Sequence, residues 1–138
     1  MNPPDAELAR LLRDARTIAV VGASSKADRP SYGVFARLKR AGYRVIPVNP
    51  FETEVHGERA YASLADVPEP IDIVDVFRRS EETPPVADDA VRAHAKVLWL
   101  QLGIVNEDAA ARARAGGLVV VMDACIAVVV SRLGIRLP

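Results

Sequence analysis

The segment from Thr17 to Ser25 is the strongest constraint on how this chain can fold. A short β-branched apolar run leads directly into Gly22, Ala23 and two serines. That order is typical of the first strand and ligand loop of an α/β nucleotide-binding fold. A dinucleotide fingerprint would continue as G-x-G-x-x-G and would place an acidic residue at the tip of the second strand. Here the second strand ends in Asn49–Pro50, so the sequence predicts a nucleotide-binding architecture without the NAD signature.

Apolar runs of strand length alternate along the chain with segments of helical period. This alternation predicts a doubly wound α/β domain, in which a parallel sheet of about five strands carries helices on both faces. The expected strands are 17–21, 43–48, 71–77, 96–100 and 118–122. The expected helices are 5–14, 31–41, 83–94 with Thr83 as its cap, an Asn106-capped helix ending at Gly116–Gly117, and 125–133. A loop is expected over 52–60 and a helical turn near 63–66.

The composition fits a single domain spanning 1–138, with its core at about 17–126. The 18 basic and 18 acidic side chains cancel, so no global field favours nucleic acid or an anionic membrane. Cys125 is the single cysteine, and the first residues lack the basic and apolar regions of a signal peptide. The apolar stretch 118–130 is split by Asp123 and is shorter than the roughly 20 residues of a membrane span. A cytoplasmic protein is therefore expected.

In an open parallel sheet, ligands bind outside the carboxyl ends of the strands, where the winding reverses. That rule selects one segment after each expected strand: 22–31, 49–51, 77–80, 101–103 and 123–125. Gly22 permits a tight turn, and Ser24, Ser25 and free backbone N–H groups can cradle a pyrophosphate. Lys26 and Arg29 add positive charge to this loop. A solvated turn that leads into the next helix is the alternative interpretation.

Three further polar residues extend this phosphate chemistry. Asn49 stands at the ribose-reading position and does not repel phosphate as a carboxylate would, which favours a nucleotide with an additional phosphate on its ribose. Arg78 and Arg79 follow the third strand, and two guanidinium groups there can chelate phosphate in fork geometry. The alternative is that one of them pairs with Glu81 or Glu82 while the other is solvated.

Catalytic and metal-binding patterns are scarce in this sequence. His56 and His94 lack Cys or carboxylate partners at metal-ligand spacing, so packed or solvated histidines are favoured and no metal site is predicted. Asp75, within an apolar strand, is expected to form hydrogen bonds with the backbone in the interior. Asp123 and Cys125 are better placed for chemistry, although a cysteine that starts a helix is more often a small buried side chain.

Several ordered motifs occur together over about residues 17–126. They are Val20–Ser24, Arg29–Tyr32, Gly42–Pro50, Val74–Arg79, Trp99–Gly103, and Val121–Asp123 with Cys125–Ile126. The combination resembles the stand-alone CoA-binding proteins, which are similar to the CoA-binding domain of succinyl-CoA synthetase α subunits and other NDP-forming acyl-CoA ligases. The resemblance implies a Rossmann-like domain that holds CoA, with the nucleotide end at the loops after the first three strands. The contacts it implies are Gly22, Ala23, Ser24, Ser25, Arg29, Pro30, Ser31, Asn49, Pro50, Phe77, Arg78, Arg79, Leu102 and Gly103. Lys26 is added to these contacts because its positive charge suits a phosphate-binding loop.

The chain departs from that family pattern after Asp123, where Ala124, Ala127, Val129 and Val130 replace polar residues. The ligases also use a phosphohistidine on a separate domain and an ATP-grasp partner. The expected function is therefore binding of CoA or acyl-CoA without catalysis by this chain alone. Two alternatives remain open: an NADP-type regulatory domain, and a small enzyme in which Asp123, with or without Cys125, acts on a CoA thioester. The apolar last helix also predicts a homo-oligomer, with a dimer as the expected form.

Overall fold

Five parallel strands form the centre of the computed structural model, which describes residues 2–138. Their order is β2-β1-β5-β6-β7, so the chain moves to one side of β1 first and then returns to build the other side. The strands are β1 (Thr17–Val21), β2 (Arg44–Val48), β5 (Ile73–Val76), β6 (Val97–Leu100) and β7 (Val119–Val121). The reversal on either side of β1 creates the switch point at which a ligand site was expected.

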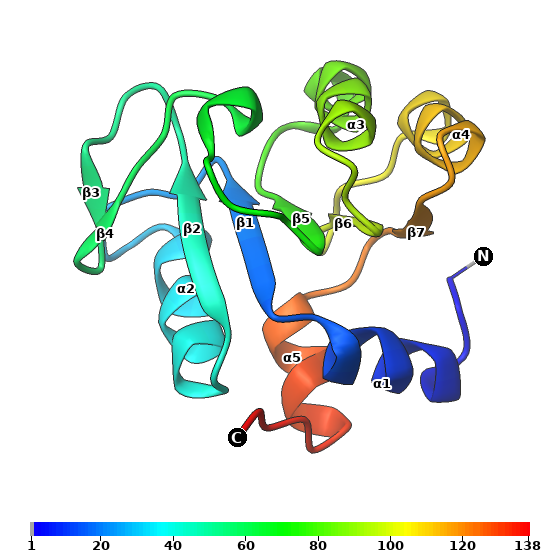
Figure 1. Cartoon of the computed structure of the whole chain (residues 1–138), viewed down its shortest axis with the longest axis horizontal. Coiled ribbons are helices and arrows are strands. Elements are labelled where there is room, and N and C mark those ends of the chain that lie inside the picture. The colour runs from blue at the N-terminus through cyan, green and yellow to red at the C-terminus, as the bar shows by residue number, and fades with distance from the viewer. Residues whose placement is uncertain (1) are drawn as a thin grey trace.

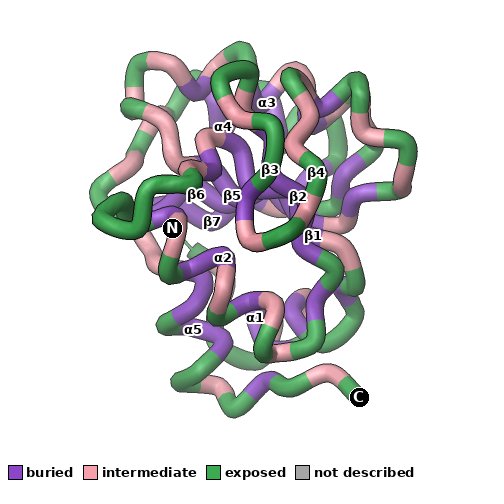
Figure 2. The backbone as a smooth tube through the Cα atoms, turned by 90° about the vertical axis from the view of Figure 1, so that its left-hand side faces the viewer, coloured by how far each residue is buried: buried purple, intermediate pink, exposed green. Residues whose placement is uncertain are grey.

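Helices cover both faces of the sheet, as the alternating pattern predicted (Figure 1). One face packs against α1 (Asp5–Asp14), α2 (Pro30–Arg40) and α5 (Ile126–Arg132). The other packs against α3 (Thr83–Arg92) and α4 (Glu107–Ala115). Alternate strand residues enter the two layers: Val20 and Trp99 face the first, while Ala19 and Leu98 face the second. Figure 2 shows that the strand residues are buried along the sheet. Because both faces of the sheet are covered, the sequence of each strand is a nearly continuous apolar run.

The boundaries of these elements lie within one or two residues of those expected. Asn106 caps α4 as predicted, because its Oδ1 accepts a hydrogen bond from the backbone N–H of Ala109 at 2.9 Å. Thr83 is the first residue of α3 and not its cap, since a 3₁₀ turn, η2 (Ser80–Glu82), runs directly into the helix. A second 3₁₀ turn, η1 (Leu64–Asp66), stands where a helical turn was expected.

The segment expected to be a loop over 52–60 contains a small antiparallel hairpin of β3 (Glu54–Val55) and β4 (Glu58–Arg59). His56 and Gly57 form its turn, both with positive φ, as a two-residue hairpin requires. The His56 ring lies 3.9 Å from the Tyr32 ring between centroids, and its Nε2 is 2.7 Å from the Tyr32 carbonyl oxygen. The histidine is therefore packed, and it attaches the hairpin to α2.

Strand β2 forms one edge of the sheet and carries Pro47 in its interior. On its outer side, the Tyr61 N–H donates to the Pro47 carbonyl oxygen at 3.0 Å, and the Asn49 N–H donates to Tyr61 at 2.8 Å. The chain around Tyr61 thus covers the end of this edge.

Asp75 on β5 is wholly buried between Val20 and Trp99 of the neighbouring strands. Neither carboxyl oxygen has a hydrogen-bond partner among the described residues. The expectation that Asp75 forms hydrogen bonds with the backbone is therefore wrong. The backbone amides of the paired strands beside it are used in the hydrogen bonds between the strands. Burial raises the pKa of Asp75 well above its ordinary value, because desolvation disfavours the charged form of the carboxyl.

The apolar helix α5 is largely covered within the chain. Ile126, Ala127, Val129 and Val130 are buried against the first layer, and Val128 is 51% exposed. The apolar surface that suggested a subunit contact is consequently much smaller than the sequence implied.

Candidate functional site

A cleft of about 840 Å³ opens at the carboxyl ends of the parallel strands. All five loops selected by the switch-point rule contribute to it or border it. The residues lining it are Gly22, Ser24, Lys26, Arg29, Pro30, Ser31, Val34, Asn49, Phe51, Glu52, Phe77, Arg78, Arg79, Gln101, Leu102, Ile104 and Cys125. The volume is in the range of small-molecule and cofactor sites.

Most of the predicted contacts meet in this cleft, and four do not line it. Ala23 is wholly buried beneath the first loop. Pro50 faces a smaller neighbouring cavity. Ser25 lies at the edge, where Glu52 holds it, and the Gly103 N–H donates to Asp123 Oδ1 at 2.7 Å.

Gly22 allows the loop after β1 to approach the loop after β5. Its φ is +87°, and a Cβ built on it would stand 2.2 Å from the carbonyl oxygen of Phe77. No side chain fits at that distance, so glycine is required both by the backbone conformation and by the close approach. This contact brings the serine loop next to Arg78.

The first loop is closed by its own serines. The Ser31 Oγ, buried in the first turn of α2, accepts from the Ser24 N–H at 3.0 Å. The Ser24 Oγ accepts from the Lys26 N–H at 3.1 Å. The Ser25 N–H and Oγ–H both donate to Glu52 Oε2, at 2.8 and 3.0 Å. These hydrogen bonds hold the shape of the loop, and the pair of donors on Ser25 is already bound to an acidic side chain.

Glu52 was not identified from the sequence. It stands three residues after Asn49, later than the position at which a dinucleotide fingerprint places its acid. Only the turn at Asn49 and Pro50 carries it back toward the first loop. The hydrogen bonds from Ser25, together with the nearby Lys26 charge, lower the pKa of Glu52 below its ordinary value.

Asn49 has a structural part in the site. Its amide nitrogen donates to the Ala23 carbonyl oxygen at 2.8 Å, and its Oδ1 accepts from the Phe51 N–H at 2.9 Å. These bonds tie the loops after β1 and β2 together. They also fix the backbone of Phe51, whose side chain is 90% exposed on the rim of the cleft.

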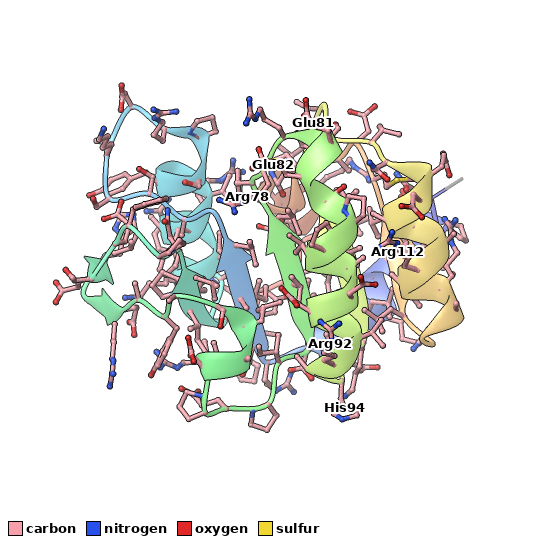
Figure 3. All side chains as sticks on the ribbon, turned by 90° about the horizontal axis from the view of Figure 1, so that it is seen from above. Arg78, Glu81, Glu82, Arg92, His94 and Arg112 are labelled. Carbon is pink, nitrogen blue, oxygen red and sulfur yellow. The ribbon has the colours of Figure 1, made fainter. Side chains whose placement is uncertain are left out.

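Arg78 and Arg79 have different surroundings, although both line the cleft. Arg79 is 79% exposed and its Nε lies 2.7 Å from Glu82 Oε2, as one of the two sequence interpretations expected. Arg78 is half-buried, and its Nε is buried without a partner among the described residues. Figure 3 shows Arg78 near the start of α3, close to Glu82. Arg78 therefore has hydrogen-bonding capacity that none of the described residues uses.

The far end of the cleft is formed by residues that follow β6 and β7. Gln101 is 5% exposed, and its Oε1 accepts from the Ile126 N–H at 3.0 Å at the start of α5. Cys125 is half-buried beside it. Sequence reasoning placed both after their strands but did not include them among the contacts. Leu102 is 70% exposed on this rim.

Asp123 lies outside the lining of the cleft. Its φ is +56°, and it is joined to the loop after β6 by its bond from Gly103 and by a bond from its own N–H to Ile104. Within residues 2–138, no group of three or more His, Cys, Asp or Glu side chains is arranged to hold a metal ion. None of the helices in this range is long and apolar enough to cross a membrane.

Comparisons with known proteins agree with this geometry. A family model described as "CoA binding domain" matches residues 16–131. The uncharacterized protein YneT of Bacillus subtilis is 46% identical over 127 residues, covering 92% of this chain and 94% of that protein. A solved hypothetical protein from Pyrococcus horikoshii is 35% identical with a TM-score of 0.93, over 95% of this chain and 92% of its own.

Several matched relatives have an assigned activity as ADP-forming acetate–CoA ligases or their subunits. The alpha subunit of an ADP-forming acetate–CoA ligase II from Pyrococcus furiosus is 44% identical over 59 residues. The match covers 42% of this chain but 13% of that subunit. It therefore concerns one small part of a much longer protein.

Proposed function

Because this chain belongs to the family of CoA-binding domains, we propose that its cleft binds CoA or an acyl-CoA through the loops at the carboxyl ends of the strands. The observation that carries this proposal is the half-buried Arg78, which lines the cleft and whose Nε has no hydrogen-bond partner among the described residues. A phosphate oxygen supplies the acceptor that this guanidinium lacks.

The distribution of polar and apolar groups in the cleft supports the same ligand. Lys26, Arg29 and Arg78 lie on the side formed by the loops after β1 and β5. Leu102 and Ile104 line the side formed by the loop after β6. A ligand with phosphates at one end and a less polar arm at the other, as in CoA, matches both sides. We assign the phosphates to the first group and the pantetheine arm to the second.

We further propose that this chain binds the ligand without transforming it. Asp123, the side chain best placed for chemistry in the sequence, is engaged by the Gly103 N–H outside the cleft lining. The activity of the Pyrococcus furiosus ligase does not transfer, since the match covers only 13% of that subunit.

Calorimetric titration of nucleotide-free protein with CoA, 3′-dephospho-CoA and NAD tests the proposal. CoA is expected to bind to the protein. The affinity is expected to fall when the ligand lacks the 3′-phosphate, and to fall further in the Arg78→Ala variant. Arg92→Ala is the matched control, because it removes an exposed arginine from the opposite end of α3 (Figure 3). Equal binding of NAD and CoA, or no CoA binding, would contradict the proposal.

A cytoplasmic location, a single domain over the whole chain and a homodimer remain predictions. Among the described residues, the large apolar side chains exposed to a second copy are Phe51, Leu102, Val105 and Val128. Light scattering at micromolar concentration is expected to give the mass of a dimer, and a monomer mass would remove this part of the proposal.

A further inference from the structure

The loop after β1 already binds an anion, which is the carboxylate of Glu52 in the same chain. Glu52 Oε2 accepts from both the N–H and the Oγ–H of Ser25. Glu52 itself lines the cleft, whereas Ser25 lies outside the lining and is bonded to this carboxylate. A backbone N–H paired with a serine hydroxyl is the arrangement that loops of this kind offer to a phosphate oxygen.

Two anions cannot share this pair of donors. A carboxylate at the donors and a phosphate beside them repel each other, and the repulsion is stronger in a partly desolvated cleft than in water. Lys26 and Arg29 are the nearby cations lining the same side of the cleft. Once the carboxylate leaves, both cations and both Ser25 donors are available to the phosphate.

We propose that Glu52 is a specificity-determining residue that occupies a phosphate subsite at Ser25 and must be displaced when a phosphorylated ligand binds. The inference rests on the proposed binding of CoA, and it adds a subsite and a competing side chain. Glu52 thereby weakens binding of the phosphate that takes its place. Ligands that bring no phosphate to Ser25 leave the carboxylate where it is.

The test is calorimetric titration of Glu52→Gln and the wild type with CoA and with 3′-dephospho-CoA. Loss of the competing charge is expected to tighten binding about tenfold, a factor typical of a single charge contact at a partly buried site. Glu54→Gln is the matched control: it removes one exposed carboxylate two residues away, outside the cleft lining. Its affinities are expected to equal those of the wild type.

The two ligands identify which phosphate displaces Glu52. Tighter binding of CoA alone assigns the subsite to the 3′-phosphate, and tighter binding of both assigns it to the pyrophosphate. Unchanged or weaker binding in Glu52→Gln, or an equal gain in Glu54→Gln, overturns the inference while the proposed function stands. If neither the wild type nor the variant binds CoA, the proposed function fails and the inference falls with it. Glu52→Ala, which removes the side chain's hydrogen bonds altogether, gives a second measurement should the glutamine variant fold poorly.

Discussion

The side-chain amide of Asn49 donates a hydrogen bond to the carbonyl oxygen of Ala23, 2.8 Å away and 26 residues earlier in the chain. The bond joins the loops that follow β2 and β1. It fixes the relative position of these two walls of the cleft. Asn49, which also lines the cleft, thus positions the loops, and its contact with a ligand stays a prediction.

Asn49→Asp is expected to destabilise the protein and to weaken CoA binding. A carboxylate cannot donate to Ala23, and it would place two acceptors against each other at hydrogen-bond distance. Loss of such a part-buried bond costs about 1 to 3 kcal/mol of unfolding free energy. Urea unfolding measures this cost, and Asn49→Ala, which adds no charge, is expected to lose less. An aspartate variant as stable as the wild type would contradict this account.

Gly22→Ala is expected to prevent normal folding of the cleft. The added Cβ would meet the Phe77 carbonyl at 2.2 Å, and φ at this position is +87°. The combined clash and strain are expected to cost on the order of 3 kcal/mol or more. Gly103→Ala is the control, because its φ of +81° is similar but its Cβ would enter open space. Thermal unfolding should show a large loss for the first variant and a small one for the second.

Arg78→Ala is expected to weaken CoA binding about 10- to 100-fold, as loss of a charge-assisted contact does. Arg79→Ala should change it less than about threefold, because an exposed ion pair already engages this guanidinium. Competition titrations with CoA measure both effects. The reverse order of effects would place the phosphate contact on Arg79.

Asp75→Asn is expected to stabilise the protein at neutral and alkaline pH. The pKa of Asp75 is raised in the folded state, so the folded protein binds more protons here than the unfolded chain. The contribution of this group to stability is therefore greatest below its unfolded pKa and is lost as the pH rises toward the folded value.

The advantage of the asparagine variant should accordingly grow as the pH rises. Each unit of difference between the two pKa values corresponds to about 1.4 kcal/mol, so a gain on the order of 1 kcal/mol or more is expected at pH 8. Urea unfolding of both proteins from pH 4 to 8 measures the difference. A difference independent of pH would show that Asp75 titrates alike in the folded and unfolded states.

Phe51→Ser is expected to weaken CoA binding by about 5- to 150-fold and to leave the stability unchanged. The ring is 90% exposed, so little apolar burial is lost on folding. An aromatic face against a nucleotide base is worth about 1 to 3 kcal/mol. Paired titration and thermal unfolding separate the two effects, and a marked fall in thermal stability would assign the ring to the fold.

The fold and the family could be predicted because they depend on features repeated along the chain. The strands of the sheet are mostly apolar on both faces, and the segments at their carboxyl ends carry the motifs that resemble the family. The hairpin at 54–59 was missed because two-residue strands have no measurable period. The contact of Glu52 with Ser25 depends on the turn at Asn49, which directs the chain back toward the first loop. No local sequence pattern predicts that direction. Asp75 was misjudged because buried carboxyls usually find partners, whereas this one has none among the described residues.

The proline in β2 also governs how molecules of this protein can meet. Pro47 has no N–H to donate, and its carbonyl oxygen is already taken by Tyr61. A strand from another molecule therefore finds neither a donor nor a free acceptor at Pro47, which opposes growth of the sheet into fibrils across the β2 edge. On this side, crowded molecules are left to associate mainly through side chains, a weaker and more reversible kind of contact than backbone pairing.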